Sequence, residues 1–261
     1  MHGKKPRGGD PIWSSGFLPS VYQATALDPR GKKPIKNLER LGELTGEQQR
    51  SLLDTLRTAN ARHARRRPFD GDLNARLESF ELAYRMQTAA PEAFDVMQEP
   101  EHIRKSYGLE RKESKEYAKQ CLTARRLIET GARFVTVNTF NRTRGSLGWD
   151  MHGRRGFSSF AELRESIAPR YDRAYWALIT SLEERGLLQE TLVCCLGEFG
   201  RSPVINPAGG RDHWTGCWTV YFAGGGIEGG RAVGRSDETG SCPADRPTDP
   251  AEITATIYHC L

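Results

Sequence analysis

Long apolar runs are missing from this chain of 261 residues. No stretch approaches the roughly 20 apolar residues that a membrane-spanning helix needs, so no membrane span is expected. Hydrophobic residues make up only 37% of the chain, yet aliphatic and aromatic side chains are too frequent for a disordered protein. The composition therefore predicts a globular protein with one large domain or two small ones.

Cysteine pairs of the CxxC type are missing as well. The six cysteines are Cys121, Cys194, Cys195, Cys217, Cys242 and Cys260. Cys194 and Cys195 are adjacent in an apolar run, and adjacent strand residues point to opposite faces, so these two thiols would not serve one site. In a chain of this length, buried free thiols are expected rather than a disulfide framework, which favours a reducing compartment.

Nucleic-acid-binding motifs are also missing, although 38 basic and 33 acidic residues give a formal net charge of +5. The densest basic run covers residues 62–67 and is typical of a solvated helix end, where cations complement the helix dipole. A phosphate-binding patch would need basic residues on one face with aromatic platforms nearby. No nucleic-acid partner is expected, and salt-sensitive DNA binding through this run is kept as the weaker alternative.

Helical signals dominate residues 45–131. Thr45 and Gln48 have the spacing of a capping box at the start of a helix. Apolar side chains at helical spacing predict a second helix over residues 73–87, and a third is expected over residues 114–130.

Strand signals alternate with helical ones in the second half of the chain. The three runs of strand composition are residues 134–137, 191–196 and 218–223. A capping box at Ser159 opens a predicted helix between the first two runs, and a final helix should begin with Asp249 as its cap and Pro250 at its first position. The order strand, helix, strand, loop, strand is the signature of a parallel sheet with helices on its faces.

The predicted fold class is therefore α/β, with a mostly parallel sheet and flanking helices. Residues 1–44 are rich in Gly, Pro and Lys and are expected to form an irregular lead-in segment. Residues 45–131 are interpreted as a helical insertion or cover, and residues 132–261 as the metal-binding α/β core of one overall domain.

Histidines and carboxylates follow the predicted strands, where open parallel sheets bind ligands. Asp150 and His152 follow the first run, Glu198 follows the second, and His213 ends the loop behind it. Imidazole combined with carboxylate suits a divalent transition metal, zinc or manganese. We predict these four side chains as metal ligands, with Asp212 orienting one of them. The alternative is that Asp150 caps a turn and His152 is an ordinary loop histidine.

Two arginines share these loops. The guanidinium groups of Arg201 and Arg211 offer planar forks that match the oxygens of phosphate or sulfate. Both are predicted as substrate-binding residues, and with a metal ion they indicate a site for a tetrahedral oxyanion ester. A surface ion pair between Glu198 and Arg201 is the plainer alternative.

Several longer motifs carry a family resemblance over nearly the whole chain. They are GWDMH, GEFGRSPVIN, GRDHW, FAGGGIEGG, PAEITATIYHCL and WSSGFLPSVYQAT. With them the chain resembles the bacterial domain-of-unknown-function family 1501, which belongs to the alkaline-phosphatase-like superfamily with the sulfatases and phosphomutases. The resemblance implies an alkaline-phosphatase-like core and a metal-dependent hydrolase of phosphate or sulfate esters, small molecules or polysaccharides.

The resemblance also assigns individual positions. Asp150, His152 and His213 match the ligands of one metal of a two-metal centre, and Glu198 matches a carboxylate ligand of the other. Phe199 stands where alkaline phosphatases have a histidine ligand, so the resemblance supports the first metal site and not the second.

Parts that family members usually have are expected to lie outside the chain. The usual first strand, its Gly-rich loop with an aspartate ligand and the nucleophile do not precede Gly9, and Leu261 falls within a helix. We expect a fragment that is incomplete at both ends and can be inactive in this form. The alternative function is a non-catalytic exported binding or structural domain with a partial metal site. The resemblance suggests export, to the periplasm or out of the cell, if the true start lies upstream, since family members often carry an export signal there. Residues 1–9 themselves are basic without an apolar segment behind them.

Overall fold

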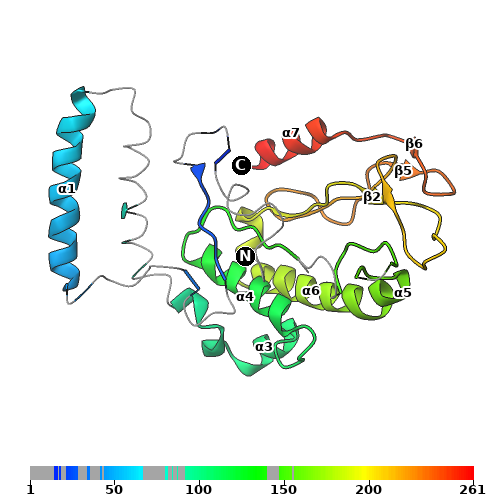
Figure 1. Ribbon diagram of the computed structural model, residues 1–261, viewed down its shortest axis with the longest axis horizontal. Helices are drawn as coiled ribbons and strands as arrows, with labels where there is room; N and C mark the ends of the chain where they lie inside the picture. The colour runs from blue at the N-terminus through cyan, green and yellow to red at the C-terminus, as the bar shows by residue number, and fades with distance from the viewer. Residues whose placement is uncertain are drawn as a thin grey trace. The chain divides into compact units, whose positions relative to one another are not determined.

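The structure, a computed structural model, describes most of the chain (Figure 1). The described residues are 44–66, 92–139, 147–154 and 156–261, with scattered positions within 15–42 and 80–87. The chain divides into two compact units, which are described separately. The first comprises residues 1–100 and 122–138, and the second comprises residues 101–121 and 139–261.

The regular elements described in the first unit are helices. Its elements include α1 (Gly46–Arg66), the short 3-10 helix η3 (Val96–Gln98) and the second half of α4 (Lys115–Glu129). The predicted start of α1 is confirmed, since the Thr45 N–H donates to Gln48 Oε1 at 2.8 Å and the Gln48 N–H donates to Thr45 Oγ1 at 3.2 Å. This capping box satisfies two backbone donors that a first helical turn leaves free. The predicted helix 73–87 and most of the lead-in 1–44 lie outside the described residues.

A buried ion-pair network stabilises this unit beside a small apolar core. The core side chains are Ile35, Ala93, Phe94 and Leu127. The Arg125 side chain of α4 is fully buried, and its guanidinium nitrogens lie 2.7 Å from Glu99 Oε2 and 2.7 Å from Glu129 Oε1. Arg126 pairs with the same Glu99. Because buried charges are tolerated only when they are paired, these contacts fix α4 against the segment that follows η3.

The helix predicted over residues 114–130 is confirmed by α4. It ends at Glu129, and Gly131 just behind it has a φ of +88°, which favours glycine. The Ala132 N–H then donates to the Leu127 carbonyl at 2.9 Å, which satisfies one of the last free carbonyls of the helix.

The second unit contains one long helical segment after residue 159. It comprises α5 (Phe160–Glu162), the π-helical turn η4 (Leu163–Ile167) and α6 (Ala168–Glu184), and the 3-10 turn η5 (Leu188–Glu190) follows. The predicted capping box is confirmed, because the Glu162 N–H donates to Ser159 Oγ at 3.2 Å and the Ser159 N–H donates to Glu162 Oε2 at 2.7 Å. Pro169 has no N–H to donate to the preceding turn, which explains the π-helical turn just before it.

Helix α6 carries the buried stripe of this unit. Its buried side chains are Ala174, Ala177, Ser181 and Leu182. The short helix α3 (Glu101–Tyr107) packs against α6, and the Tyr107 hydroxyl lies 2.5 Å from Ser181 Oγ. Both hydroxyls are buried, so this bond satisfies two polar groups that have lost water.

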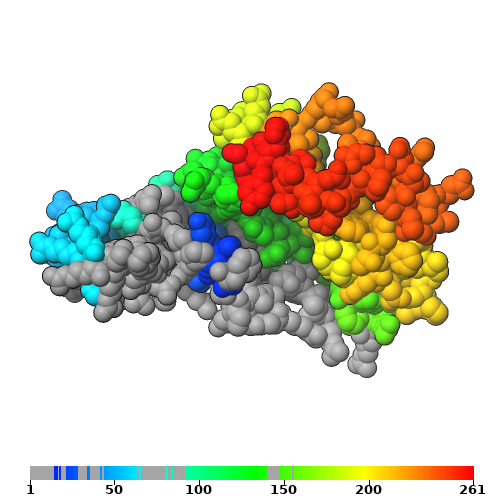
Figure 2. Space-filling view, turned by 90° about the horizontal axis from the view of Figure 1, so that it is seen from above, coloured from blue at the N-terminus to red at the C-terminus, as the bar shows by residue number. Residues whose placement is uncertain are grey.

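The strands of the second unit are short. They are β1 (Val193–Cys195), β2 (Gly200–Arg201), β3 (His213–Trp214), β4 (Tyr221–Ala223), β5 (Arg235–Ser236) and β6 (Pro243–Asp245). β1 pairs with β4, β2 with β3, and β5 with β6, always antiparallel. The last helix, α7 (Pro250–Cys260), has the predicted cap, since the Glu252 N–H donates to Asp249 Oδ1 at 2.9 Å. None of its residues is buried, and it lies on the surface in Figure 2.

The predicted mostly parallel sheet, and with it the α/β class, is wrong for the described residues. Each of their sheets has two antiparallel strands, and residues 134–137 form no strand, with Phe134 78% exposed. Parallel neighbours need a crossover connection, usually a helix. The connection between β1 and β4, residues 196–220, contains no helix, so the chain returns antiparallel. β1 is also only half-buried, whereas the prediction assumed a strand covered on both faces.

Among the described helices, none combines the length and the apolar character needed to cross a membrane. The six cysteines are free thiols, of which Cys121 is buried, Cys242 is exposed and the others are half-buried.

Candidate metal centre

The first part of the site is a tight loop that follows residue 147. Ser158, only 2% exposed, closes this loop from within. Its Oγ accepts from the Gly148 N–H at 2.9 Å, its N–H donates to the Asp150 carbonyl at 3.0 Å, and its carbonyl accepts from the Gly153 N–H at 2.9 Å. These three bonds hold the backbone on both sides of the first two predicted ligands, Asp150 and His152.

Aromatic packing anchors the same loop to α6. The Trp149 ring meets the Tyr171 ring edge-on, with centroids 5.4 Å apart, and its Nε1 donates to Thr139 Oγ1 at 2.8 Å. Tyr171 is itself stacked with Tyr117 at 6.0 Å and with Tyr175 at 5.5 Å. The residue that precedes the first candidate ligand is therefore fixed by a layer of rings and one side-chain hydrogen bond.

The second part of the site is the β2–β3 hairpin and its connecting loop. Arg201 and His213 are opposite each other in the hairpin register, which brings both to one edge of the loop. The backbone of Arg211 joins this loop to the first, because its N–H donates to the Met151 carbonyl at 2.7 Å. Two segments that lie about sixty positions apart in the chain thus form one surface.

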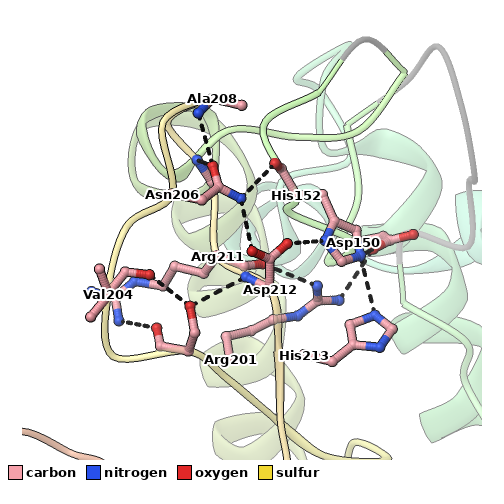
Figure 3. A network of polar contacts seen from close by, with 11 residues as sticks. Asp150, His152, Arg201, Val204, Asn206, Ala208, Arg211, Asp212 and His213 are labelled. Atoms are coloured by element: carbon pink, nitrogen blue, oxygen red, sulfur yellow. Dashed lines mark hydrogen bonds and ion pairs between the residues drawn. The ribbon is translucent and has the colours of Figure 1, made fainter.

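Three of the four predicted ligands come together there (Figure 3). Nε2 of His152 lies 3.2 Å from Oδ1 of Asp150 and 3.2 Å from Nε2 of His213. One ligand atom from each of these three residues lies within 4.8 Å of the other two. We call Asp150, His152 and His213 the ligand cluster. Its first two residues are half-buried and His213 is exposed.

The position of the His152 proton follows from its other partner. Nδ1 of His152 lies 2.9 Å from Oδ1 of Asp212. Hydrogen bonds from His152 and Asn206 hold the pKa of the Asp212 carboxyl below its usual value, so this group is ionised and can only accept. Nδ1 of a neutral His152 therefore carries the proton, and the Nε2 lone pair faces Asp150 and His213.

This arrangement places two acceptors opposite each other. The lone pair of His152 Nε2 faces the Asp150 carboxylate at 3.2 Å, a contact that is repulsive unless a proton or a cation lies between the two atoms. A proton on Nε2 would satisfy one of the contacts, whereas a metal ion would satisfy all three ligand atoms. Neighbouring ligands of tetrahedral zinc are about 3.3–3.6 Å apart when each bond is roughly 2.0–2.2 Å. The two separations of 3.2 Å in the ligand cluster are close to this spacing.

The donor set also fits a metal site with an open position. Two imidazoles and one carboxylate are a common protein ligand set for zinc, and manganese accepts the same groups. The exposure of His213 leaves one side of the ligand cluster accessible to water or to a substrate. Phe199 and Phe157 pack against the imidazoles, with ring centroids 4.3 Å from His213 and 5.2 Å from His152.

The fourth predicted ligand is not part of this cluster in the described residues. Glu198 is exposed in the turn between β1 and β2. Phe199, the residue after it, contacts His213 instead of offering a ligand atom. The role of Glu198 as a ligand remains a prediction.

The two predicted substrate-binding arginines have different surroundings. Arg201 reaches the ligand cluster, with one guanidinium nitrogen 3.3 Å from Asp150 Oδ1 and the other 3.4 Å from the Arg211 carbonyl. Arg211 donates to the carbonyls of Ser202 at 2.7 Å and Pro203 at 3.0 Å. Its guanidinium also lies over the Phe160 ring, 5.1 Å from the centroid. Arg201 is thus beside the candidate metal position, and Arg211 is engaged in holding the loop.

Asn206 is a residue of the site that the sequence motifs did not single out. Its side chain bonds to His152, Asp212 and the loop backbone, as Figure 3 shows. The available signal was its position before Pro207, where Asn often initiates a turn. That signal predicts a turn, and it carries no information about the distant partner His152.

Comparison with models of protein families identifies a family for this chain. The family model described as "Protein of unknown function (DUF1501)" matches residues 1–261. Neither the search of curated proteins nor the search of solved structures found a significant match.

Proposed function

The chain belongs to the DUF1501 family of proteins of unknown function, and on that premise we propose that its ligand cluster binds one divalent metal ion for the hydrolysis of phosphate or sulfate esters. The observation that carries the proposal is the convergence of Asp150, His152 and His213 from two separate loops. The lone pair of His152 and the carboxylate of Asp150 face each other at 3.2 Å, where a cation relieves their repulsion. Zinc is favoured by the two imidazoles, and manganese is the second candidate.

The bound metal would polarise an ester oxygen or lower the pKa of a coordinated water. The protein residues around it then have separate tasks. Asp150, His152 and His213 would hold the ion, and Asp212 would orient His152. Arg201 would neutralise the charge of a tetrahedral oxyanion, since its guanidinium already lies beside the ligand Asp150.

The proposal includes kinship with the alkaline-phosphatase-like and sulfatase-like superfamily, which is more specific than membership of the family. It is supported by the order of the motifs GWDMH, GEFGRSPVIN and GRDHW, of which the first supplies Asp150 and His152, the second the predicted ligand Glu198 and the third His213. The strands of the described residues pair antiparallel, so the arrangement of the sheets does not support this kinship. The proposal of kinship therefore rests on the chemistry of the site and on its motifs.

A second candidate function is a non-catalytic binding domain that keeps a metal site. The observation that favours it concerns Ser202, a hydroxyl at the edge of the site. Its Oγ donates to the Val204 carbonyl at 2.6 Å and accepts from the Asp212 N–H at 3.3 Å. This hydroxyl is therefore engaged in loop structure, and in the second candidate it does not serve as a nucleophile. Ester turnover separates the two candidates, since both predict metal binding.

Metal binding is tested on the full chain after chelation and dialysis. Calorimetric titration with Zn²⁺ and then with Mn²⁺ should give one ion per chain. His213→Ala should weaken binding sharply, because two remaining protein ligands rarely hold zinc against water. His102→Ala is the matched control, since His102 is exposed on α3 outside the ligand cluster and its loss should leave metal content unchanged.

The activity arm uses p-nitrophenyl phosphate and p-nitrophenyl sulfate with the metal-loaded protein. Metal-dependent release of p-nitrophenol, lost in His213→Ala and kept in His102→Ala, would support the hydrolase. Metal binding without turnover of either ester would favour the binding domain. Equal metal retention in wild type and both variants would place the metal site elsewhere and contradict both candidates.

A further inference from the structure

Asn206 uses every polar group of its side chain within the candidate metal centre. Its Nδ2 donates to the His152 carbonyl at 3.1 Å and to Asp212 Oδ2 at 3.3 Å. Its Oδ1 accepts from the N–H groups of Ala208 and Gly210, each at 3.0 Å. Two oxygens face one end of the amide and two N–H groups face the other, so only one orientation of this amide satisfies all four contacts.

Asp212 links Asn206 to the imidazole of His152. One carboxylate oxygen of Asp212 accepts from His152 Nδ1 at 2.9 Å, and the other accepts from Asn206 Nδ2 at 3.3 Å. The Asp212 side chain is 48% exposed, so packing alone does not hold it in one rotamer. The bond from Asn206 supplies the second fixed point that a half-exposed carboxylate needs to keep its direction.

Asn206 is therefore linked to both the backbone and the side chain of His152. It holds the backbone carbonyl directly and the imidazole through Asp212. We propose that Asn206 is the positioning residue of the metal site: through Asp212 it keeps the His152 proton on Nδ1 and directs the Nε2 lone pair toward Asp150 and His213. The inference rests on the proposed metal site, but it concerns a tautomer that can be measured in the metal-free protein as well.

Two substitutions separate this positioning role from a role in loop structure. Asn206→Asp keeps an oxygen that can accept from the N–H groups of Ala208 and Gly210, and it removes the donor that reaches Asp212 and the His152 carbonyl. Asn206→Ala removes both sets of bonds. Asn60→Ala on α1 is the matched control, because it makes the same change of side chain outside the site and in the other unit.

The first measurement is the tautomer of His152 in the metal-free full chain, read from long-range ¹H–¹⁵N correlations at a pH well above the ordinary histidine pKa of about 6.5. The His152 signals are assigned by their loss in His152→Gln. Wild type and Asn60→Ala should show the proton on Nδ1. In Asn206→Asp and Asn206→Ala a second form with the proton on Nε2 should appear, because Asp212 no longer has a fixed direction.

The second measurement is the Kd for Zn²⁺ by calorimetry on the same proteins, whose folding is checked by circular dichroism. Loss of an outer-shell partner typically weakens metal binding about 10-fold to 100-fold, and this is the expected range for Asn206→Asp. Asn60→Ala should bind zinc as wild type does. In Asn206→Asp, an unchanged His152 tautomer or an unchanged zinc Kd would overturn the positioning role.

Metal binding by the wild-type chain and the His152 tautomer distinguish failure of the proposed function from failure of this inference. If the wild-type chain binds neither zinc nor manganese, the proposed metal site is wrong, and the tautomer alone decides the role of Asn206. A wild-type His152 with its proton on Nε2 would overturn the inference whether or not metal binds.

Discussion

Gly210 lies so close to Gly153 that neither position has room for a side chain. A Cβ on Gly210 would lie 2.2 Å from the Gly153 nitrogen and 2.2 Å from the His152 carbonyl carbon. A Cβ on Gly153 would lie 2.3 Å from the Ala208 carbonyl oxygen and 2.5 Å from the Gly210 nitrogen, and the φ of +70° at Gly153 already favours glycine. This contact between two backbones sets the distance between the two loops that carry the ligand cluster.

Gly210→Ala should therefore force the two loops apart. We expect it to lower the free energy of unfolding by about 1–3 kcal/mol, the usual cost of an overpacked position, and to weaken zinc binding as His213 moves away from His152. Thermal unfolding and calorimetric titration measure the two effects. Gly229→Ala is the control, since a Cβ there would meet nothing within 4 Å and its φ is not in the left-handed region. Equal stability and zinc affinity in the two variants would show that the loops are not held by this contact.

We expect Arg201 to bind an anion and Arg211 to support the loop. Because the contacts of Arg201 with Asp150 and the Arg211 carbonyl are long, at 3.3 and 3.4 Å, Arg201→Ala should lower the free energy of unfolding less than Arg211→Ala. It should weaken binding of inorganic phosphate to the zinc-loaded chain about tenfold or more, the loss of one charge-assisted hydrogen bond. Arg211→Ala should instead lower the free energy of unfolding by about 1–3 kcal/mol, because two carbonyls lose their donor. Thermal unfolding and phosphate titration of both variants check this division, and the opposite pattern would reverse the assignment.

The buried network around Glu99 should make stability depend on acid pH. Burial raises the pKa of Glu99, but the hydrogen bonds and charges of Arg125 and Arg126 outweigh it and leave the pKa below the usual value. A carboxylate with a depressed folded-state pKa contributes stability above its unfolded pKa, and this contribution is lost as the pH falls through the folded-state value. Unfolding by urea, followed from neutral pH down to below the ordinary glutamate pKa of about 4.3, should show this loss in wild type.

Glu99→Gln should remove that pH-dependent component. It also deprives the fully buried Arg125 of one of its two carboxylates, so the variant should be less stable at neutral pH by about 3 kcal/mol. Glu101→Gln is the control, because Glu101 forms an exposed pair with Lys105 on α3 and should matter little. An identical pH profile for wild type and Glu99→Gln would exclude the ion-pair network as its source.

Part of the candidate site could be predicted from the sequence. Asp150, His152 and His213 stand in motifs rich in glycine, and the structure brings these three together. The different surroundings of Arg201 and Arg211 could not be predicted from the sequence, because both are arginines in loops of similar composition. Which one faces Asp150 depends on how the β2–β3 hairpin is paired. Asn206 was missed for a related reason, since its main partner lies 54 positions earlier in the chain.

Helix starts were the part of the fold that local sequence decided. The capping boxes at Thr45, Ser159 and Asp249 all form as their spacing predicts. Donor and acceptor in such a box are three residues apart, so the interaction is contained in the segment that shows the pattern. Strand pairing was decided by tertiary structure alone. The runs at β1 and β4 are strands, as their composition indicates, but their direction depends on the path of residues 196–220 between them. An apolar run carries the same pattern in a parallel or an antiparallel sheet, because the hydrogen bonds that distinguish the two belong to its partner.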